Sequence, residues 1–138
     1  MAIYRSIVYS NVICDDLSVP LILVLLSAVI VLIGYILFFM VMRQNSYASR
    51  VIEIQKNQKV IDTGLYALVR HPMYFASILM FLFMPLLLGS FYSLILMLIY
   101  PFQINLRIKN EEEILEKGLD EYSEYKKKVR YKVIPFLW

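Results

Sequence analysis

The chain has 138 residues, of which 60% are hydrophobic, and its formal net charge is +3. A soluble domain is usually only about 45–50% apolar, so the composition predicts one integral membrane domain covering residues 1–138. The basic residues lie beside apolar segments and among acidic ones, which argues against a nucleic-acid partner. The single cysteine, Cys14, excludes a disulfide or a cysteine-based metal site within one chain.

The first long apolar segment, residues 19–42, contains no charged residue. As a helix its 24 residues would extend ~36 Å, enough for a tilted crossing of a ~30 Å hydrocarbon core. Pro20 suits the first helical turn. The N-terminal segment 1–18 is not expected to contain a further membrane helix, because residues 1–16 lack the composition of one.

The second uncharged segment, residues 75–104, is long for one crossing and short for two. Gly89 and Ser90 interrupt it near the middle, which predicts a helical hairpin over residues 73–108 with a tight turn. Pro85 and Pro101 are expected to kink its two legs. The predicted fold is therefore all-α, with about three transmembrane helices formed by one span and one hairpin.

The basic residues predict the orientation of these helices. All of the 14 lysines and arginines except Arg5 lie in the loop 43–72 or from Arg107 onward. By the positive-inside rule, the loop 43–72 and the C-terminal tail 109–138 face the cytoplasm, and the N-terminus and the hairpin turn face outward. We expect an integral protein of a cell membrane, bacterial in type.

The C-terminal tail is predicted to be helical and to lie at the membrane interface. Residues 111–117 favour a helix that is continuous with the third span or restarts at Asn110, and that stops at Gly118. Residues 120–130 would place Tyr122, Tyr125 and Val129 on one helical face. The aromatic ending 134–138 is typical of an anchor at the membrane surface.

The loop 43–72 ends in residue types that can bind a charged ligand. Pro72 suits the start of a helix, whose N–H groups can hold an anion. Arg70 suits a carboxylate or phosphate, and Tyr74 offers an aromatic face to a cation. Taken singly, Arg70 could instead contact lipid headgroups, and Tyr74 could belong to the interfacial aromatic belt.

The only histidine is His71. No motif places a second ligand beside it, so we predict no metal site. Because histidine titrates near neutral pH, His71 is a candidate general base. The acidic triplet 111–113 is either a solvated helix start favoured by the helix dipole, or a group that turns back toward the loop to bind hydroxyls or a cation.

Taken together, these segments resemble the isoprenylcysteine carboxyl methyltransferase and phospholipid methyltransferase superfamily of membrane enzymes. The resemblance covers about residues 60–138, and the two motifs are more specific as a pair than singly. Ala76 stands where the family has a glycine, and the region before Val51 is short for the family. The segments that carry the resemblance are Arg70-His71-Pro72-Met73-Tyr74, Arg107-Ile108 with Glu111-Glu112, Tyr122 with Tyr125, and Ile134-Pro135.

The resemblance implies S-adenosylmethionine as cofactor, bound at the cytoplasmic membrane face. It implies methyl transfer to a membrane lipid or a lipidated substrate, most like isoprenylcysteine carboxyl O-methylation. Phospholipid N-methylation and a non-catalytic membrane protein that retains the fold are the alternatives, and a homo-oligomer could complete a substrate tunnel. The implied cofactor-binding residues are Arg70, His71, Pro72, Tyr74, Glu111 and Glu112, and the candidate catalytic residues are His71 and Arg107.

The acceptor determines which catalytic groups are needed. A carboxylate acceptor is already ionised, whereas an amine must lose a proton, which His71 or a glutamate could take. Arg107 could position a carboxylate or phosphate headgroup. We expect Glu112 to line the pocket with Tyr74. Glu111 is then the weaker candidate, and Glu113 points ~100° away from Glu112.

Overall fold

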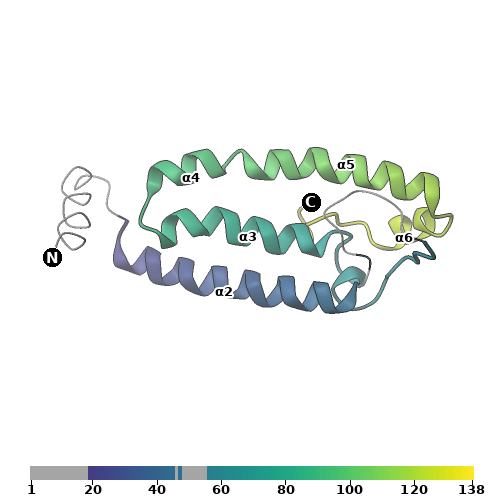
Figure 1. The fold of residues 1–138 in the computed structure, drawn as a ribbon, viewed down its shortest axis with the longest axis horizontal. Coiled ribbons are helices and arrows are strands. Elements are labelled where there is room, and N and C mark those ends of the chain that lie inside the picture. The colour runs from purple at the N-terminus through teal and green to yellow at the C-terminus, as the bar shows by residue number, and fades with distance from the viewer. Residues whose placement is uncertain (1–18, 46, 48–55) are drawn as a thin grey trace.

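The computed structural model describes residues 19–45, 47 and 56–138. The expectations for Cys14 and for the N-terminal segment therefore lie outside the described residues. Within them the chain is helical and contains no β-strand, which confirms the predicted all-α class for this part of the protein (Figure 1). The elements are α2 (Leu21–Gln44), η2 (Gly64–Ala67), α3 (Pro72–Leu87), α4 (Phe91–Met97), α5 (Tyr100–Gly118) and α6 (Tyr122–Lys128).

Helices α2 and α3 lie side by side and share the most extensive contact between elements (Figure 1). The approach is close at Gly34 of α2, where an added Cβ would lie 2.7 Å from Met80 Cγ and 3.2 Å from Ala76 O. Ala76 itself is fully buried. Because α2 has a glycine, Gly34, at this contact, α3 has room for the methyl group of Ala76.

The predicted turn at Gly89 and Ser90 is present. Gly89 has a φ of +77°, a conformation that glycine adopts at little cost. The N–H groups of Gly89 and Ser90 donate to Leu86 O and Pro85 O at 3.0 and 2.9 Å. Ser90 then caps α4, because its Oγ accepts the N–H of Ser93 at 3.2 Å.

The returning leg of the hairpin is built from two helices. Pro101 lies in the first turn of α5, and Leu98 and Ile99 before it keep helical backbone angles, so α4 and α5 follow each other as one segment interrupted beside the proline. Helix α5 continues through the acidic triplet to Gly118, which confirms the continuous alternative and the predicted stop. Helix α6 is shorter than the expected 120–130, since Val129 is already extended.

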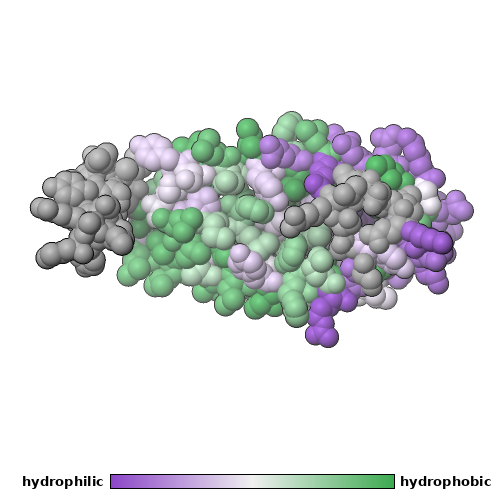
Figure 2. Space-filling model, in the orientation of Figure 1, coloured by the Kyte–Doolittle hydropathy of each residue, from purple (hydrophilic) through white to green (hydrophobic). Residues whose placement is uncertain are grey.

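In the part of the chain that the structure describes, two helical segments are long and apolar enough to cross a membrane, Leu21–Gln44 and Phe91–Gly118. Helix α3 has 16 residues and would extend ~24 Å, which is short for a ~30 Å hydrocarbon core. Hydrophobic side chains cover the helical body, and hydrophilic ones gather at the end that holds α6 and the C-terminal half of α5 (Figure 2). This distribution supports a membrane protein, while the number of crossings and their orientation stay predictions.

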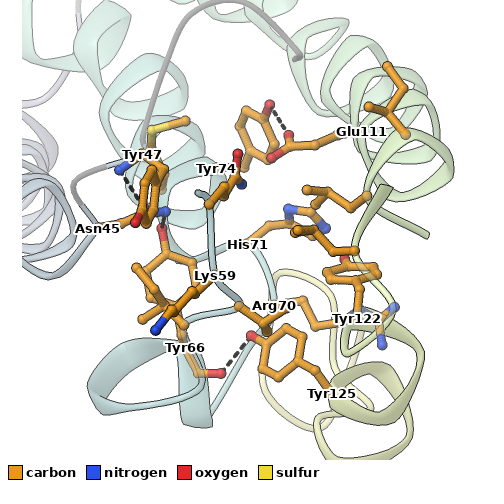
Figure 3. Close-up of a pocket in the computed structure, with 17 residues that line it drawn as sticks. Asn45, Tyr47, Lys59, Tyr66, Arg70, His71, Tyr74, Glu111, Tyr122 and Tyr125 are labelled. Atoms are coloured by element: carbon orange, nitrogen blue, oxygen red, sulfur yellow. Dashed lines mark hydrogen bonds between the residues drawn. The ribbon is translucent and has the colours of Figure 1, made fainter. Parts of the chain in front are cut away.

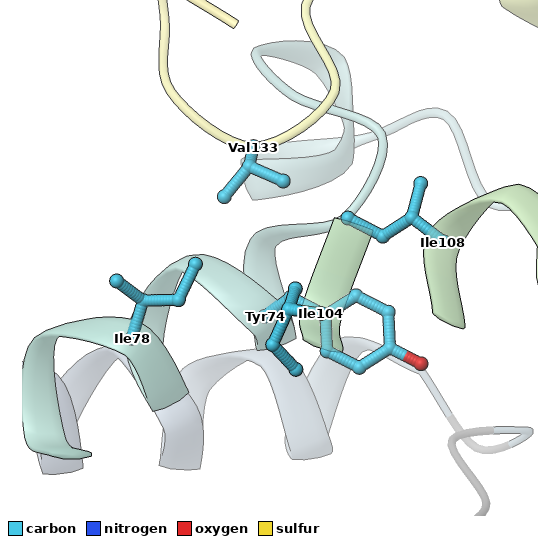
Figure 4. Close-up of a cluster of buried hydrophobic side chains, with 5 residues drawn as sticks. All are labelled: Tyr74, Ile78, Ile104, Ile108 and Val133. Atoms are coloured by element: carbon cyan, nitrogen blue, oxygen red, sulfur yellow. The ribbon is translucent and has the colours of Figure 1, made fainter. Parts of the chain in front are cut away.

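The hydrophobic core joins α3, α5 and the C-terminal segment (Figure 4). It contains Tyr74 and Ile78 of α3, Ile104 and Ile108 of α5, and Val133. Ile108 and Val133 are fully buried. The C-terminal segment is therefore part of the fold and closes over the start of α3.

A second cluster fixes α6. Tyr122, Tyr125 and Val129 are buried together, which confirms the predicted shared face, and Leu115 and Leu119 pack against them. Beyond α6 the backbone closes on itself, because Trp138 O accepts the N–H groups of residues 132, 133 and 134 at 2.9–3.0 Å. Phe136 and Leu137 are 87% and 79% exposed. An interfacial anchor at this end stays a prediction.

Candidate functional site

The site is built where the start of α3 meets the extended segment after α6. The N–H groups of Arg70 and His71 donate to Tyr131 O at 3.0 Å and to Lys132 O at 2.8 Å. Pro72 follows at the first turn of α3, where its missing N–H costs nothing. The loop residues 70–71 and the tail residues 131–132 are thus joined through their backbones.

The Arg70 guanidinium strengthens this junction from inside the protein. Its Nη1 donates to Val129 O at 2.8 Å and to Arg130 O at 3.1 Å, while its Nε donates to Glu112 Oε1 at 2.8 Å. The side chains of Arg70 and Glu112 are 4% and 6% exposed. A planar guanidinium can make these three contacts at once, which a lysine cannot.

The buried Glu112 is the centre of an ionic cluster that extends to the partly exposed Lys126 and Lys132. His71 Nε2 lies 3.3 Å from Glu112 Oε1, and the ammonium groups of Lys126 and Lys132 lie 3.7 and 3.9 Å from Oε2. The hydrogen bond to Glu116 raises the pKa of Lys126, and the charge of Glu112 acts in the same direction. Glu112 is therefore a carboxylate surrounded by cationic or protonatable partners.

A second polar chain crosses from α5 to α3. The hydroxyl of Tyr74 donates to Glu111 Oε2 at 2.6 Å and accepts from Arg107 Nε at 2.9 Å. The Arg107 guanidinium carbon also lies 6.0 Å from the centroid of the Tyr74 ring. The tyrosine is thereby held between a carboxylate and a guanidinium, one helical turn apart on α5.

A cavity of about 100 Å³, open to solvent on one side, lies between these groups (Figure 3). Its walls come from the end of α2, residues 58–61, η2, the start of α3, the second half of α5, and α6. The volume has room for several water molecules, so a larger ligand would also occupy the open side. Among the described residues, no group of three or more His, Cys, Asp or Glu side chains could hold a metal ion.

The two ends of the cavity differ in chemistry (Figure 3). Tyr74 and Glu111 form one end, and Tyr122 and Tyr125 form the other. Burial raises the pKa of both Tyr122 and Tyr125, so these hydroxyls stay protonated. Tyr125 donates to Tyr66 O at 2.7 Å. The Tyr122 hydroxyl is buried and has no hydrogen-bond partner among the described residues.

The structure brings four of the nominated residues to the cavity wall: Arg70, His71, Tyr74 and Glu111. Arg107 is not in the wall but reaches it through Tyr74. Pro72 lies instead in an apolar groove on another side of α3. Whether any of these residues binds a cofactor stays a prediction.

The structure places Glu111 at the cavity instead of Glu112, which is the reverse of the expected order. Glu111 lines the cavity, whereas Glu112 is outside its lining and turns into the ionic cluster. Glu113 points outward, as expected, and pairs with Lys117 at 2.6 Å on the exposed surface. Three consecutive residues of α5 thus have three surroundings: Glu111 lines the cavity, Glu112 lies inside the protein and Glu113 lies on the surface.

Several cavity residues were not expected from the sequence. Tyr122 and Tyr125 were placed on a buried face, but their hydroxyls on that face were not connected with a ligand. Asn45 and Tyr66 are joined by a hydrogen bond of 2.8 Å between Asn45 Nδ2 and the tyrosine oxygen. No local pattern signals this contact, because the residues are 21 positions apart across a loop.

Comparisons with known proteins bear on the same residues. A search among proteins of curated function finds no significant match. The model of the isoprenylcysteine carboxyl methyltransferase family matches residues 22–117, which is more than half of the chain and includes Arg70 to Tyr74 and the acidic triplet.

Proposed function

Because the chain belongs to the isoprenylcysteine carboxyl methyltransferase family, we propose that it transfers a methyl group from S-adenosylmethionine to a lipid-like acceptor at the cytoplasmic membrane face. The family supports methyl transfer in general. The cofactor, the acceptor and the orientation are the parts that we propose.

One observation carries the proposal: the two halves of the sequence motif meet at one cavity. Tyr74 and Glu111 are 37 positions apart, yet their oxygens are 2.6 Å from each other in its wall. This end of the cavity offers a carboxylate and an aromatic ring, which suit a cationic group. The cavity also lies at the polar end of the apolar helices (Figure 2), where a headgroup could enter while its lipid tail stays in the bilayer.

The residues present fit the proposed cofactor. S-adenosylmethionine carries an ammonium, a sulfonium, ribose hydroxyls and a flat base, and it supplies an activated methyl group on sulfur when bound. Glu111 and Tyr74 match the positive groups, and the aliphatic and aromatic wall near Leu115, Leu119 and Tyr122 matches the base. The protein's task is then to align the acceptor with the methyl group and to exclude water.

A carboxylate acceptor requires no general base, because it is ionised at neutral pH. Arg107 is a suitable group to attract it, since a guanidinium binds carboxylates with two parallel hydrogen bonds. Tyr74 accepts from Arg107 Nε at 2.9 Å, which fixes the guanidinium near the end of the cavity that Tyr74 and Glu111 form. This arrangement favours carboxyl O-methylation as the proposed reaction.

The pairing of His71 with Glu112 favours phospholipid N-methylation as a second candidate. His71 lines the cavity, and its Nε2 lies 3.3 Å from Glu112 Oε1. A carboxylate in this position can orient the imidazole ring for proton transfer. His71 could therefore take the proton that an amine acceptor must lose.

The test is methyl transfer by the purified protein in liposomes with radiolabelled S-adenosylmethionine. Two acceptors are offered separately: a prenylated cysteine with a free carboxylate, and phosphatidylethanolamine. We expect label that base releases as methanol, since methyl esters are base-labile. Stable label in the phospholipid would select N-methylation, and no label with any lipid extract would favour the non-catalytic alternative.

Two substitutions on α5 provide the matched control. Glu111→Gln should reduce the rate of labelling, because it removes the charge from the cavity wall. Glu113→Gln should not, because its side chain is 65% exposed and pairs only with Lys117. An equal loss in both variants would indicate an effect on folding and would remove the support for a site at Glu111.

A further inference from the structure

The Tyr122 hydroxyl is the one buried side-chain polar group without a hydrogen-bond partner among the described residues. The residue is only 4% exposed and lies in the cavity wall. Burying a hydroxyl without a partner is unfavourable, so native proteins rarely leave one unless a ligand or water completes the bond. This hydroxyl therefore points to a missing partner inside the cavity.

Neighbouring polar groups do not supply that partner. Tyr125, one turn along α6, uses its hydroxyl to reach Tyr66 O at 2.7 Å. Glu112 Oε1 is engaged by Arg70 and His71, and its Oε2 faces the ammonium groups of Lys126 and Lys132. None of these groups forms a hydrogen bond with the Tyr122 hydroxyl.

The surroundings of Tyr122 indicate what kind of ligand group it meets. Its ring lies 5.8 Å from that of Tyr125, and Val60, Leu115 and Leu119 pack against the pair. Such a wall suits a flat, uncharged group with hydrogen-bonding atoms on its edge. The charged end of the cavity, at Tyr74 and Glu111, is the opposite one (Figure 3).

We propose that the Tyr122 hydroxyl hydrogen-bonds the amino edge of the adenine of the bound cofactor, with Leu115 and Leu119 against the ring. A phenol hydroxyl can donate to the ring nitrogen or accept from the amino group on this edge. The cofactor then lies with its base toward α6 and its sulfur toward Tyr74 and Glu111. This assignment rests on the proposed function and makes Tyr122 a residue that positions the base.

The test compares Tyr122→Phe with Tyr125→Phe, using S-adenosylhomocysteine and methylthioadenosine as ligands. Methylthioadenosine keeps the base and ribose but lacks the amino-acid part. Tyr122→Phe should weaken both ligands by the same factor, roughly twofold to tenfold, as expected for one neutral hydrogen bond. Its unfolding temperature without ligand should stay the same or rise, because an unpaired hydroxyl is removed.

Tyr125→Phe is the matched control, because its hydroxyl already has a partner in the protein. It should lower the unfolding temperature without ligand, since Tyr66 O loses its donor.

Three results would overturn the assignment. Unchanged affinities in a folded Tyr122→Phe would mean that the hydroxyl does not meet the ligand. A loss restricted to S-adenosylhomocysteine would place Tyr122 at the amino-acid end. If the unchanged protein binds neither ligand, the proposed function fails and the assignment fails with it, whereas the first two results leave the proposed function intact.

Discussion

The three glutamates of the acidic triplet have different surroundings, so the same isosteric change should have three different effects. Glu112→Gln acts on a side chain that is 6% exposed and bonded to the buried Arg70 at 2.8 Å. It leaves the guanidinium without its counter-charge. Breaking a buried ion pair in this way costs about 3–5 kcal/mol, and for a chain of this length the unfolding temperature should fall on the order of 10 °C.

Glu111→Gln should instead act on ligand binding. Its carboxylate accepts from the Tyr74 hydroxyl at the cavity wall, and an amide oxygen can keep that contact without the charge. Losing one charge-assisted contact to a cationic ligand costs about 1.5–3 kcal/mol, a tenfold to hundredfold weakening of affinity. Glu113→Gln should change neither property, because Glu113 and its partner Lys117 are exposed.

The assay is thermal unfolding of the detergent-solubilised protein, followed by calorimetric titration with S-adenosylhomocysteine. The expected pattern is a stability loss only at Glu112 and an affinity loss at a stable Glu111→Gln. If Glu112→Gln unfolds at the same temperature as the unchanged protein, the ionic cluster does not support the fold. If all three variants bind alike, Glu111 does not contact the ligand and the argument from its place in the cavity wall is refuted.

Three further predictions test the junction, the helix contact and the topology. Arg70→Lys keeps the charge, but a lysine cannot bond Glu112, Val129 O and Arg130 O together. We therefore expect the free energy of unfolding to fall by about 2 kcal/mol and trypsin to cleave faster after the basic residues of 126–130. An unchanged cleavage rate would show that Arg70 does not hold the tail in place. Gly34→Val places carbon atoms against Met80 and Ala76 O. It should lower the free energy of unfolding by about 1–3 kcal/mol, measured by thermal unfolding. No change would mean that α2 and α3 are not closely packed there. Ser90→Cys should react with a membrane-impermeant thiol reagent from outside the cell, whereas Asn57→Cys should react only after permeabilisation. The opposite labelling pattern would reverse the proposed orientation.

Local signals were sufficient for parts of this fold. Gly89 and Ser90 interrupt an apolar run, so the turn of the hairpin could be located without a structure. The spacing of Tyr122, Tyr125 and Val129 likewise predicted their shared face, because helical periodicity depends only on neighbours in sequence. In both cases the information is contained within a few turns of chain.

The arrangement of the site depends on contacts that no local pattern contains. Arg70 and Glu112 are 42 positions apart, and their pairing follows from the rotation of α5 about its axis. Since residues on every side of α5 after Arg107 include polar ones, the sequence could not decide whether Glu111 or Glu112 faces the cavity. The hydrogen bonds from residues 70–71 to residues 131–132 were missed for the same reason.

The junction at Arg70 has a consequence for how the protein matures on the ribosome. The guanidinium bonds the carbonyl of Val129, which is made 59 residues later, so Arg70 lacks this partner until the tail has been synthesised. During that interval the Arg70 guanidinium must stay hydrated, because burying a cation without partners is unfavourable, and this opposes premature burial of the start of α3. Completion of the tail then releases this restraint, which makes assembly of the site one of the last events of biogenesis.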